Sequence, residues 1–448
     1  ASASLEDIAR SATAPLWFQL YIQPDRDFTL ALVRRAEAAG YGAIVLTADA
    51  LMALPTETPL PTPTATALPT HVPELPEDSE AILITGAGRQ GEPLILRYQT
   101  DASGAVVGDS ARLDTSVWGP RDRLYGAWPS PRGRYVALDS IYGDAGHTVR
   151  VLDAATGTVG APVPQAGFGH WDYVFGYHLD WHPDGRRLLV QGAKQTGTPG
   201  STLLVHAGSG QGDVLALPGA HLASYVVTSA SFAPGGQEFV VSYVEGSKGL
   251  SEVWVSSLDG GHRLLYTATG ERVEYVGWSP SGEWIALVRW NPGPDASEWE
   301  YTGELELLRP KSGEQVSLGS AAMSHYPADP LSPQWDSKGE RLAFFVGNRL
   351  SLEVELPVET NVRVWGTNTG AVTALTDDHE RLRTGLSWAP DGSELLFTER
   401  TLDAEIPTVL VAVSIGGQRR SPLPSDDLGS ELGSLSRGVW LASEAQGE

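Results

Sequence analysis

Residues 278–287 read WSPSGEWIAL, and residues 388–397 read WAPDGSELLF. Both stretches consist of a tryptophan, a Pro-x-Gly turn and a run of strand-forming residues. A third clear copy, WHPDG, begins at Trp181, and looser copies begin at Trp128, Phe232 and Trp335. The six turn glycines lie 46 to 57 residues apart. A repeat of this length, with one strand–turn–strand unit in each copy, predicts a β-propeller.

The turn has a physical reason in each copy. Proline presets φ at the first central position, Asp or Ser suits the next, and glycine takes the left-handed position that closes a bulged hairpin. The preceding aromatic residue ends one strand, and an apolar run begins the next. We therefore expect Trp181, Trp278, Trp335 and Trp388 to pack in the core between neighbouring blades.

The two ends of residues 81–448 complement one another. Residues 81–85 and 93–98 read as strands ahead of the first repeat, and residues 437–442 read as a strand after the last one. If the C-terminal strand becomes the innermost member of the N-terminal blade, the ring closes and no sheet edge stays open there. The sequence thus predicts an all-β, seven-bladed propeller, with six blades as the alternative.

These repeats resemble the WD-like repeats of the TolB-type propellers, whose blades carry Trp-Ser-Pro-Asp-Gly-x-x-Leu-Ala-Phe. Residues 278–287 and 388–397 match that phrase best, and the resemblance extends over residues 120–448. It implies a propeller fold. It also implies a binding role, since such propellers mostly bind other molecules, although the fold hosts many activities.

Composition limits the partners. The 448-residue chain has a formal net charge of −24, which argues against nucleic acid and against anionic membrane surfaces. It contains no cysteine, so disulfides and thiolate chemistry are excluded. We find no apolar stretch of membrane-spanning length and no signal peptide at the start of the sequence.

Residues 1–50 form a different kind of segment. Leu16 to Ile22 and Ala43 to Thr47 are apolar, strand-like runs, and Thr29 to Ala39 has helical composition and ends at Gly40. Strand, helix and strand in this order predict one parallel β-α-β unit.

The amino-acid sequence of this segment resembles that of the FMN-dependent 2-hydroxyacid oxidases and dehydrogenases. The matching stretches are WFQLY at 17–21, LVRRAEAAGY at 32–41 and LTAD at 46–49. The resemblance implies that Gln19, Tyr21 and Thr47 line a flavin and substrate site. The family's later Ser-Asn-His-Gly-Gly-Arg segment and its flavin-contacting lysine are absent, and a complete eight-stranded barrel needs about 250 residues. We therefore expect no bound cofactor, and FMN is the alternative.

Residues 51–80 are rich in proline and threonine, as in PTETPLPTPT at 55–64. This composition predicts an extended, polyproline-like linker. Such tracts resemble the stalks that hold bacterial surface proteins away from the envelope, with threonines as glycan acceptors. This points to an extracellular, cell-surface or periplasmic location, although a plain linker has the same composition.

Catalytic and metal-binding motifs are missing. The sequence has no Gly-x-Ser-x-Gly nucleophile elbow. His379-Glu380-x-x-Arg383 lacks the second histidine of a zinc-binding helix. Acidic pairs such as Asp377-Asp378 match no calcium loop. We predict no catalytic residue and no metal site.

One set of residues suggests a binding surface. In an up-and-down blade with strands a to d, the b–c and d–a connections lie at one end of the ring, and the motif turns lie at the other. The b–c and d–a connections contain aromatic residues outside the motif, together with acidic residues. We predict that these aromatic residues form a ligand or partner face: Trp118, Trp171, Tyr173, Trp290, Trp299 and Tyr301. Exposed aromatic clusters on loops mark sites for protein, peptide or carbohydrate ligands. The alternative is that these rings pack the loops against the blades.

The sequence therefore favours a non-catalytic binding or assembly module on a Pro/Thr stalk. Two other functions stay open at this point. The first is an FMN-dependent 2-hydroxyacid oxidase, supported by the N-terminal segment alone. The second is a structural subunit of an extracellular polymer, which would assemble through the N-terminal segment or the linker.

Overall fold

The computed structural model describes the following residues: 17–21, 33–36, 38–39, 43–47, 80–101, 104–108, 110–119, 122–142, 147–163, 180–192, 201–215, 225–245, 250–290, 302–322, 331–351, 356–379, 381–401, 408–423 and 432–442. The chain divides into two compact units, Ala1–Leu68 and Pro69–Glu448. Residues 51–79, which hold the predicted linker, lie outside the described residues.

The N-terminal unit contains two parallel strands, β1 (Trp17–Tyr21) and β2 (Ala43–Thr47). Residues 33–36 between them are helical. The predicted β-α-β order is therefore confirmed. Parallel pairing requires such a crossover, because a short hairpin turn can join only antiparallel strands.

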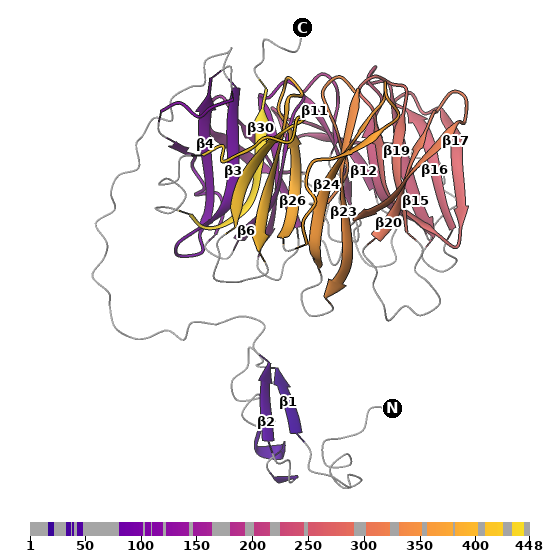
Figure 1. The fold of residues 1–448 in the computed structure, drawn as a ribbon. Coiled ribbons are helices and arrows are strands. Elements are labelled where there is room, and N and C mark those ends of the chain that lie inside the picture. The colour runs from indigo at the N-terminus through magenta and orange to yellow at the C-terminus, as the bar shows by residue number, and fades with distance from the viewer. Residues whose placement is uncertain are drawn as a thin grey trace. The chain divides into compact units, whose positions relative to one another are not determined.

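The second unit is a seven-bladed β-propeller, as predicted (Figure 1). Each blade is a four-stranded antiparallel sheet, and we number the blades from the first motif turn. Blades 1 to 3 consist of β6 (Asp122–Pro129), β7 (Tyr135–Tyr142), β8 (His147–Asp153) and β9 (Thr158–Val163); β10 (Asp180–Trp181), β11 (Arg187–Gly192), β12 (Ser201–His206) and β13 (Gly212–Val214); and β14 (Tyr225–Phe232), β15 (Glu238–Glu245), β16 (Leu250–Ser257) and β17 (His262–Thr269).

The remaining four blades follow the same order. Blades 4 to 6 consist of β18 (Arg272–Trp278), β19 (Ile285–Trp290), β20 (Thr302–Leu308) and β21 (Gln315–Ala322); β22 (Gln334–Trp335), β23 (Arg341–Ser351), β24 (Leu356–Gly366) and β25 (Val372–Ala374); and β26 (Arg381–Trp388), β27 (Glu394–Thr401), β28 (Val409–Ser414) and β29 (Arg419–Arg420). Blade 7 joins the two ends of the ring and consists of β30 (Leu432–Leu441), β3 (Glu80–Gly88), β4 (Pro93–Thr100) and β5 (Ala111–Arg112).

Blade 7 confirms the predicted closure. The C-terminal strand β30 is its first strand and pairs antiparallel with β3, from Ala81 opposite Leu441 to Gly88 opposite Leu432. In Figure 1 the yellow β30 lies beside the indigo β3. β30 also packs against β26 of blade 6 and β6 of blade 1. The ring therefore depends on pairing between the two ends of the repeat region.

The turn glycines adopt the predicted left-handed conformation, with φ between 68° and 76° at Gly133, Gly185, Gly236, Gly282, Gly339 and Gly392. Space is a second reason for glycine at two of these turns. A Cβ at Gly339 would lie 2.4 Å from the backbone nitrogen of Ser281 in the preceding blade's turn. A Cβ at Gly133 would lie 1.7 Å from the carbonyl oxygen of Ala442, which follows β30. Successive turns thus pack directly on one another.

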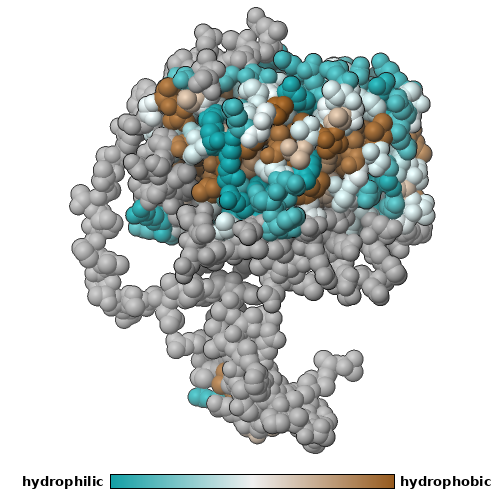
Figure 2. All heavy atoms as spheres, viewed as in Figure 1, coloured by the Kyte–Doolittle hydropathy of each residue, from teal (hydrophilic) through white to brown (hydrophobic). Residues whose placement is uncertain are grey.

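The motif aromatics are core residues, as predicted. Trp181, Trp278 and Trp388 are buried, and Trp335 is partly buried against the cluster shared by blades 4 and 5. The exposed large apolar side chains include three on the outermost strands: Val214 on β13, Leu264 on β17 and Val372 on β25. In the view of Figure 2, hydrophobic residues gather around the middle of the blades. Single apolar residues at such a surface are ordinary.

The innermost strands would leave backbone N–H and C=O groups unpaired at the centre of the ring, and hydrogen bonds between blades satisfy some of them. At three junctions a side chain just before the motif aromatic accepts from the next blade's backbone N–H: Phe232 N to Asp180 Oδ2 (2.7 Å), Trp278 N to Ser231 Oγ (3.0 Å) and Trp440 N to Ser387 Oγ (3.0 Å). At three others the indole donates to the preceding blade's carbonyl: Trp181 to Trp128 (2.9 Å), Trp335 to Gly277 (3.2 Å) and Trp388 to Gln334 (2.9 Å). The repeated tryptophan therefore packs in the core and also joins its blade to the preceding one by a hydrogen bond.

Asp180 is the ionisable member of this inner set, and its burial raises the pKa of its carboxyl to about 6. The folded protein thus holds this proton more tightly than the unfolded chain does. The associated stability is complete below about pH 4 and is lost as the pH rises through about 6. Asp180→Asn keeps an acceptor for Phe232 N–H and removes the titration. We expect this variant to gain up to about 3 kcal/mol of unfolding free energy at pH 7.5, relative to wild type.

Urea unfolding of both proteins at several pH values checks this prediction, and the difference should vanish near pH 4. Asp184→Asn is the matched control with the opposite sign. Burial alone would raise the pKa of the Asp184 carboxyl, but its hydrogen bonds from Arg186 and Arg187 and the nearby His182 lower it overall. An Asp180→Asn variant that is less stable than wild type at pH 7.5 would contradict the assignment.

Candidate functional site

The strand order fixes two different ends of the ring. Each blade runs a–b–c–d with antiparallel neighbours, so the six Pro-x-Gly-type turns between strands a and b share one end. The b–c and d–a connections share the other end. We call these the turn end and the long-connection end. The prediction that the two long-connection classes meet at one end follows from this observed topology.

The six repeats share the same type of residue at some positions and differ from one another at others. Three to five residues after each turn glycine, every repeat has buried apolar residues, for example Ile285-Ala286-Leu287 and Leu395-Leu396-Phe397. Seven residues after the glycine, strand b approaches the long-connection end, and the residue type changes in every repeat: Ser140, Gly192, Tyr243, Arg289, Val346 and Glu399. The propeller requires no particular side chain there, so this end carries the chain's individual chemistry.

Two of these positions join strand b to the d–a connection of a neighbouring blade. In blade 1, Ser140 accepts a hydrogen bond from the indole of Trp118 at 3.0 Å. In blade 4, the Arg289 guanidinium forms ion pairs with Glu271, which precedes β18, and with Glu306 on β20. At these two positions the variable side chain therefore holds the neighbouring connection against the ring.

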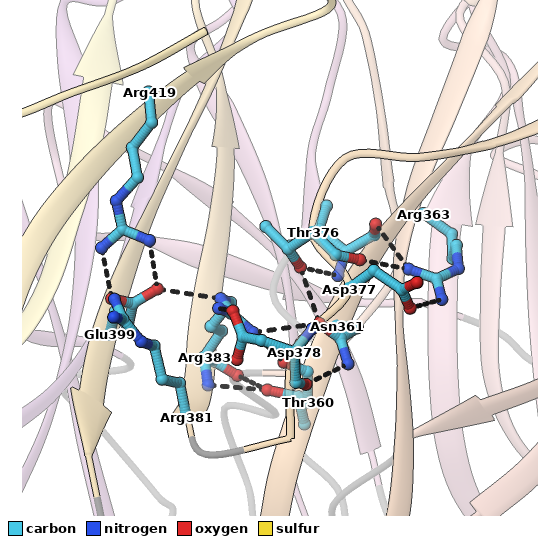
Figure 3. Close-up of polar contacts among 11 residues, drawn as sticks. Thr360, Asn361, Arg363, Thr376, Asp377, Asp378, Arg381, Arg383, Glu399 and Arg419 are labelled. Carbon is cyan, nitrogen blue, oxygen red and sulfur yellow. Dashed lines mark hydrogen bonds and ion pairs between the residues drawn. The ribbon is translucent and has the colours of Figure 1, made fainter. Parts of the chain in front are cut away.

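The largest such network surrounds Arg383 on β26, whose side chain is fully buried (Figure 3). Its Nε donates to Glu399 Oε2 at 2.9 Å, and its Nη1 donates to the carbonyl oxygen of Thr360 at 2.7 Å. Its Nη2 pairs with Asp378. Thr360 lies on β24 of blade 5, and Glu399 lies on β27 of blade 6. Arg383 thus links two blades and the connection between them.

The connection itself is held by Asn361. Its Nδ2 donates to the carbonyl oxygen of Asp378 at 2.7 Å, and its Oδ1 accepts from Thr376 Oγ1 at 3.0 Å. Arg363 adds an ion pair with Asp377 at 3.2 Å. Residues 376–378 are therefore held by β24. The half-exposed Asp378, the exposed Asp377 and the exposed His379 that follows them lie at the long-connection end.

Glu399 receives three arginines: Arg381, Arg383 and Arg419. Burial alone would raise the pKa of this carboxyl, but the hydrogen bonds from Arg419 and Arg381 and the charge of Arg383 lower it below its ordinary value. Glu399 therefore stays ionised, and it is committed to ion pairing rather than to proton transfer. The arrangement supports anchoring and recognition, and it offers no general base.

The structure corrects the prediction for two of the aromatic residues. Trp118 and Trp290 lie at the long-connection end but are 7% and 8% exposed. The guanidinium of Arg150 covers the ring of Trp118, and that of Arg272 covers Trp290, each at 5.8 Å. The prediction that these two rings are exposed is therefore wrong. Burying a large aromatic face against a blade and an arginine stem removes more apolar surface from water than leaving it exposed.

The other four predicted face residues, Trp171, Tyr173, Trp299 and Tyr301, lie outside the described residues. The charged network, in contrast, was missed at the sequence level. The incomplete zinc-binding motif His379-Glu380-x-x-Arg383 drew attention to this segment. It suggested a metal site, however, and not an ion-pair network. The partners Thr360 and Glu399 come from other strands, so no local spacing could reveal them.

In the N-terminal unit, the three residues of the flavin resemblance occupy related register positions. Gln19 pairs with Val45, and Tyr21 lies opposite Thr47 at the carboxyl ends of β1 and β2. The structure thus brings Tyr21 and Thr47 to the same edge of a two-stranded sheet. Two strands supply only part of what a flavin site needs, because such sites in barrels are built from the loops of many strands.

Within the described part of the chain, no group of three or more His, Cys, Asp or Glu residues has a metal-binding arrangement. Among the same residues, no helix has the length and the apolar character that a membrane crossing requires.

Comparison with known proteins separates the two units. A family model described as FMN-dependent dehydrogenase matches residues 1–76. Over 53 residues the chain is 60% identical to an L-lactate oxidase of Alicycliphilus denitrificans. This match covers 12% of the present chain and 14% of the oxidase. A 2-hydroxyacid oxidase 2 of Mus musculus is 51% identical over 51 residues and is likewise covered over 14% of its length. The chain thus spans about one seventh of these relatives.

Solved structures resemble the propeller. TolB from Acinetobacter baumannii aligns over 96% of this chain and 97% of its own, with 12% identity and a TM-score of 0.41. A prolyl endopeptidase structure aligns over 77% of this chain and 50% of its own, with 13% identity and a TM-score of 0.50. At this identity the likeness concerns the fold.

Proposed function

We propose that the propeller is a non-catalytic binding or assembly module and that its partner engages the long-connection end. The observation that carries this proposal is the contrast between the ends of the repeats. The turn end repeats one phrase, whereas the residue seven positions after the turn glycine differs in all six repeats. A seven-bladed propeller fits a binding module, and loops on a rigid scaffold are the usual place for recognition.

The chemistry of this end suggests the class of partner. Its connections contain aromatic residues together with acidic ones, including Asp295, Glu298 and Glu300 between β19 and β20. Aromatic rings stack on sugars and on peptide side chains, and carboxylates favour neutral or cationic ligands. We therefore propose that the ligand is a neutral carbohydrate or a neutral-to-basic peptide or protein. The Pro/Thr tract suggests that the protein meets this ligand at the cell surface, in the periplasm or outside the cell.

Tryptophan fluorescence titrations test the proposal with three defined probes: cellohexaose, chitohexaose and pentalysine. We expect a saturable change with at least one probe and a loss of at least tenfold in affinity, or about 1.4 kcal/mol, in Trp171→Ala or Trp299→Ala. A charge change at the turn end, Lys338→Ala, serves as the matched control and should bind like wild type. No response to any probe, or an equal loss in the control, would overturn the proposal in this form.

A second candidate, an FMN-dependent 2-hydroxyacid oxidase, rests on the match over residues 1–76. The segment supplies Gln19, Tyr21 and Thr47 on two strands, which is too few elements for a flavin site. We propose that the chain alone holds no FMN. The purified protein should show no flavin absorbance near 450 nm after incubation with excess FMN and desalting, and it should not oxidise lactate or glycolate. Stoichiometric retained FMN would reverse the assignment.

Self-assembly into a polymer is the remaining alternative. Light scattering of the full chain and of a chain lacking residues 1–50 separates the two cases. A binding module should keep the same mass per particle in both, apart from the deleted residues. Concentration-dependent growth that disappears with residues 1–50 would favour the structural role.

A further inference from the structure

Tyr243 on β15 is the residue that blade 3 places seven positions after its turn glycine, and its hydroxyl is buried without a partner. The side chain is 5% exposed, and among the described residues no group hydrogen-bonds to its Oη. Burial, together with the charge of Glu252, raises the pKa of Tyr243 above its usual range, so the phenol stays protonated. The free protein therefore holds a buried donor that lacks an acceptor, which is costly and rare in folded proteins.

Other buried hydroxyls of the same blade are paired. Thr228 Oγ1 donates to the carbonyl oxygen of Val273 at 2.6 Å, and Ser229 Oγ donates to the carbonyl oxygen of Val276 at 3.2 Å. Both bonds reach blade 4, whereas Tyr243 packs in the core cluster between blades 2 and 3. Blade 3 thus satisfies these hydroxyls on its blade 4 side and leaves Tyr243 unsatisfied on its blade 2 side.

The facing strand of blade 2 has a second hydroxyl of this kind. Thr202 on β12 is completely buried, and in the part of the chain that the structure describes its Oγ1 has no hydrogen-bond partner. Leu204, two positions further along β12, packs in the same cluster as Tyr243, and side chains two apart on a strand share a face. Thr202 and Tyr243 therefore face one junction from its two sides. Both lie near the strand ends that meet the long connections.

A carboxylate lies next to the unpaired phenol. Glu252 on β16 is directly opposite Tyr243 in the register of blade 3. Its Oε2 accepts from the indole Nε1 of Trp254 at 2.9 Å, which orients the carboxylate, and no described residue donates to its Oε1. Glu252 and Trp254 are both partly exposed, so a ligand can reach them from solvent. The junction thus offers an acceptor, a donor and an aromatic ring.

The acceptor and the donor together select the chemistry of a ligand. An ammonium or guanidinium group can pair with Glu252, but it has no lone pair that accepts from Tyr243. A carboxylate or phosphate accepts from Tyr243, but Glu252 repels it. A neutral hydroxyl both donates and accepts, so it can donate to Glu252 Oε1 and accept from Tyr243 Oη at the same time.

We propose that Tyr243, Glu252 and Trp254 form a carbohydrate subsite in which one sugar hydroxyl bridges Tyr243 and Glu252. The indole of Trp254, on the same face of β16 as Glu252, contacts the apolar face of the sugar ring. Thr202 makes the junction polar from the side of blade 2. The subsite rests on the proposed binding function of the long-connection end, and it narrows the ligand to the neutral carbohydrate.

Tyr243→Phe tests the subsite, because it removes only the hydroxyl. In tryptophan fluorescence titrations the variant should bind cellohexaose or chitohexaose at least about tenfold more weakly than wild type. Without ligand it should melt at the same or a higher temperature, since the lost group has no partner. Tyr275→Phe is the matched control. The Tyr275 hydroxyl donates to the carbonyl oxygen of Pro333 at 2.8 Å, so its loss should lower Tm and leave the sugar affinity unchanged.

Glu252→Gln tests the carboxylate and the class of ligand. The amide oxygen can still accept from the Trp254 indole, but it is a weaker acceptor for a sugar hydroxyl than a carboxylate is. We expect the sugar affinity to fall about threefold or more. A loss of pentalysine binding in Glu252→Gln, with no effect of Tyr243→Phe on any probe, would mean that the site binds a cation, and the carbohydrate proposal would fail.

Unchanged sugar affinity in Tyr243→Phe overturns the subsite at either Tm. A lower Tm would then mean that an internal water satisfies the hydroxyl, and a higher Tm would mean that the hydroxyl serves no ligand. This failure differs from a failure of the proposed function, in which no probe binds wild type or the control Lys338→Ala loses as much affinity. Wild-type protein that binds pentalysine but neither sugar would keep the proposed function and overturn the subsite.

Discussion

A chain that ends before Leu432 should lose the cooperative unfolding transition of the propeller. The truncation removes β30, which pairs with β3 along its whole length and supplies the innermost strand of blade 7. Val439, Trp440 and Leu441 on β30 are almost completely buried in two different core clusters. Full burial of such a side chain stabilises by about 1.5–3 kcal/mol. The unpaired edge of β3 adds a cost of about 1–3 kcal/mol for each buried group left unsatisfied.

Together these losses match or exceed the 5–15 kcal/mol that is typical of a whole domain. Circular dichroism melts should therefore show a broad transition, or a fall in Tm of more than about 10 °C. Truncation after Ala442 is the matched control, since it keeps every described strand of the ring, and it should shift Tm by no more than about 3 °C. A chain without β30 that melts like wild type would mean that six blades suffice.

Arg383→Ala should lower the unfolding free energy by about 3–5 kcal/mol, which is the usual result of removing one partner from a buried ion pair. The substitution leaves the buried Glu399 without its interior partner, and it opens the link from β26 to Thr360 on the neighbouring blade. Arg381→Ala is the matched control. Arg381 binds the same carboxylate but is 39% exposed, so its removal should cost less than about 1 kcal/mol. Urea unfolding of the three proteins measures the difference.

Two further measurements distinguish ion pairing from simple space filling. The variant Arg383→Leu with Glu399→Leu should recover much of the lost stability, because apolar side chains of similar volume replace a buried pair at little cost. The lowered pKa of Glu399 stabilises the fold fully above the unfolded-state pKa and progressively less as the pH falls through the folded-state pKa. Arg383→Ala should therefore weaken this acid sensitivity. An equal loss in Arg383→Ala and Arg381→Ala would contradict the buried-pair explanation.

The sequence by itself determined the architecture because its signals are local and repeated. The Pro-x-Gly turn demands φ values that glycine supplies at Gly282 and Gly392, and the apolar runs after it form the second strand of each hairpin. The six turn phrases and the unpaired strands at the two ends of the repeat region then give seven blades. The closing strand β30 pairs with β3 as predicted. The parallel order of β1 and β2 follows from strand–helix–strand order in the same way.

Only the tertiary structure decided how individual side chains are used. Trp118 and Trp290 read as candidate binding platforms, yet Arg150 and Arg272 cover their rings, and neither arginine is close enough in sequence to indicate this. Arg383 finds Thr360, Asp378 and Glu399 on three different elements, and Arg132 meets Gly185 across a blade junction. Turn geometry depends on neighbours along the chain, whereas burial and ion pairing depend on neighbours in space. In a ring of blades, the neighbours in space are often some fifty residues away.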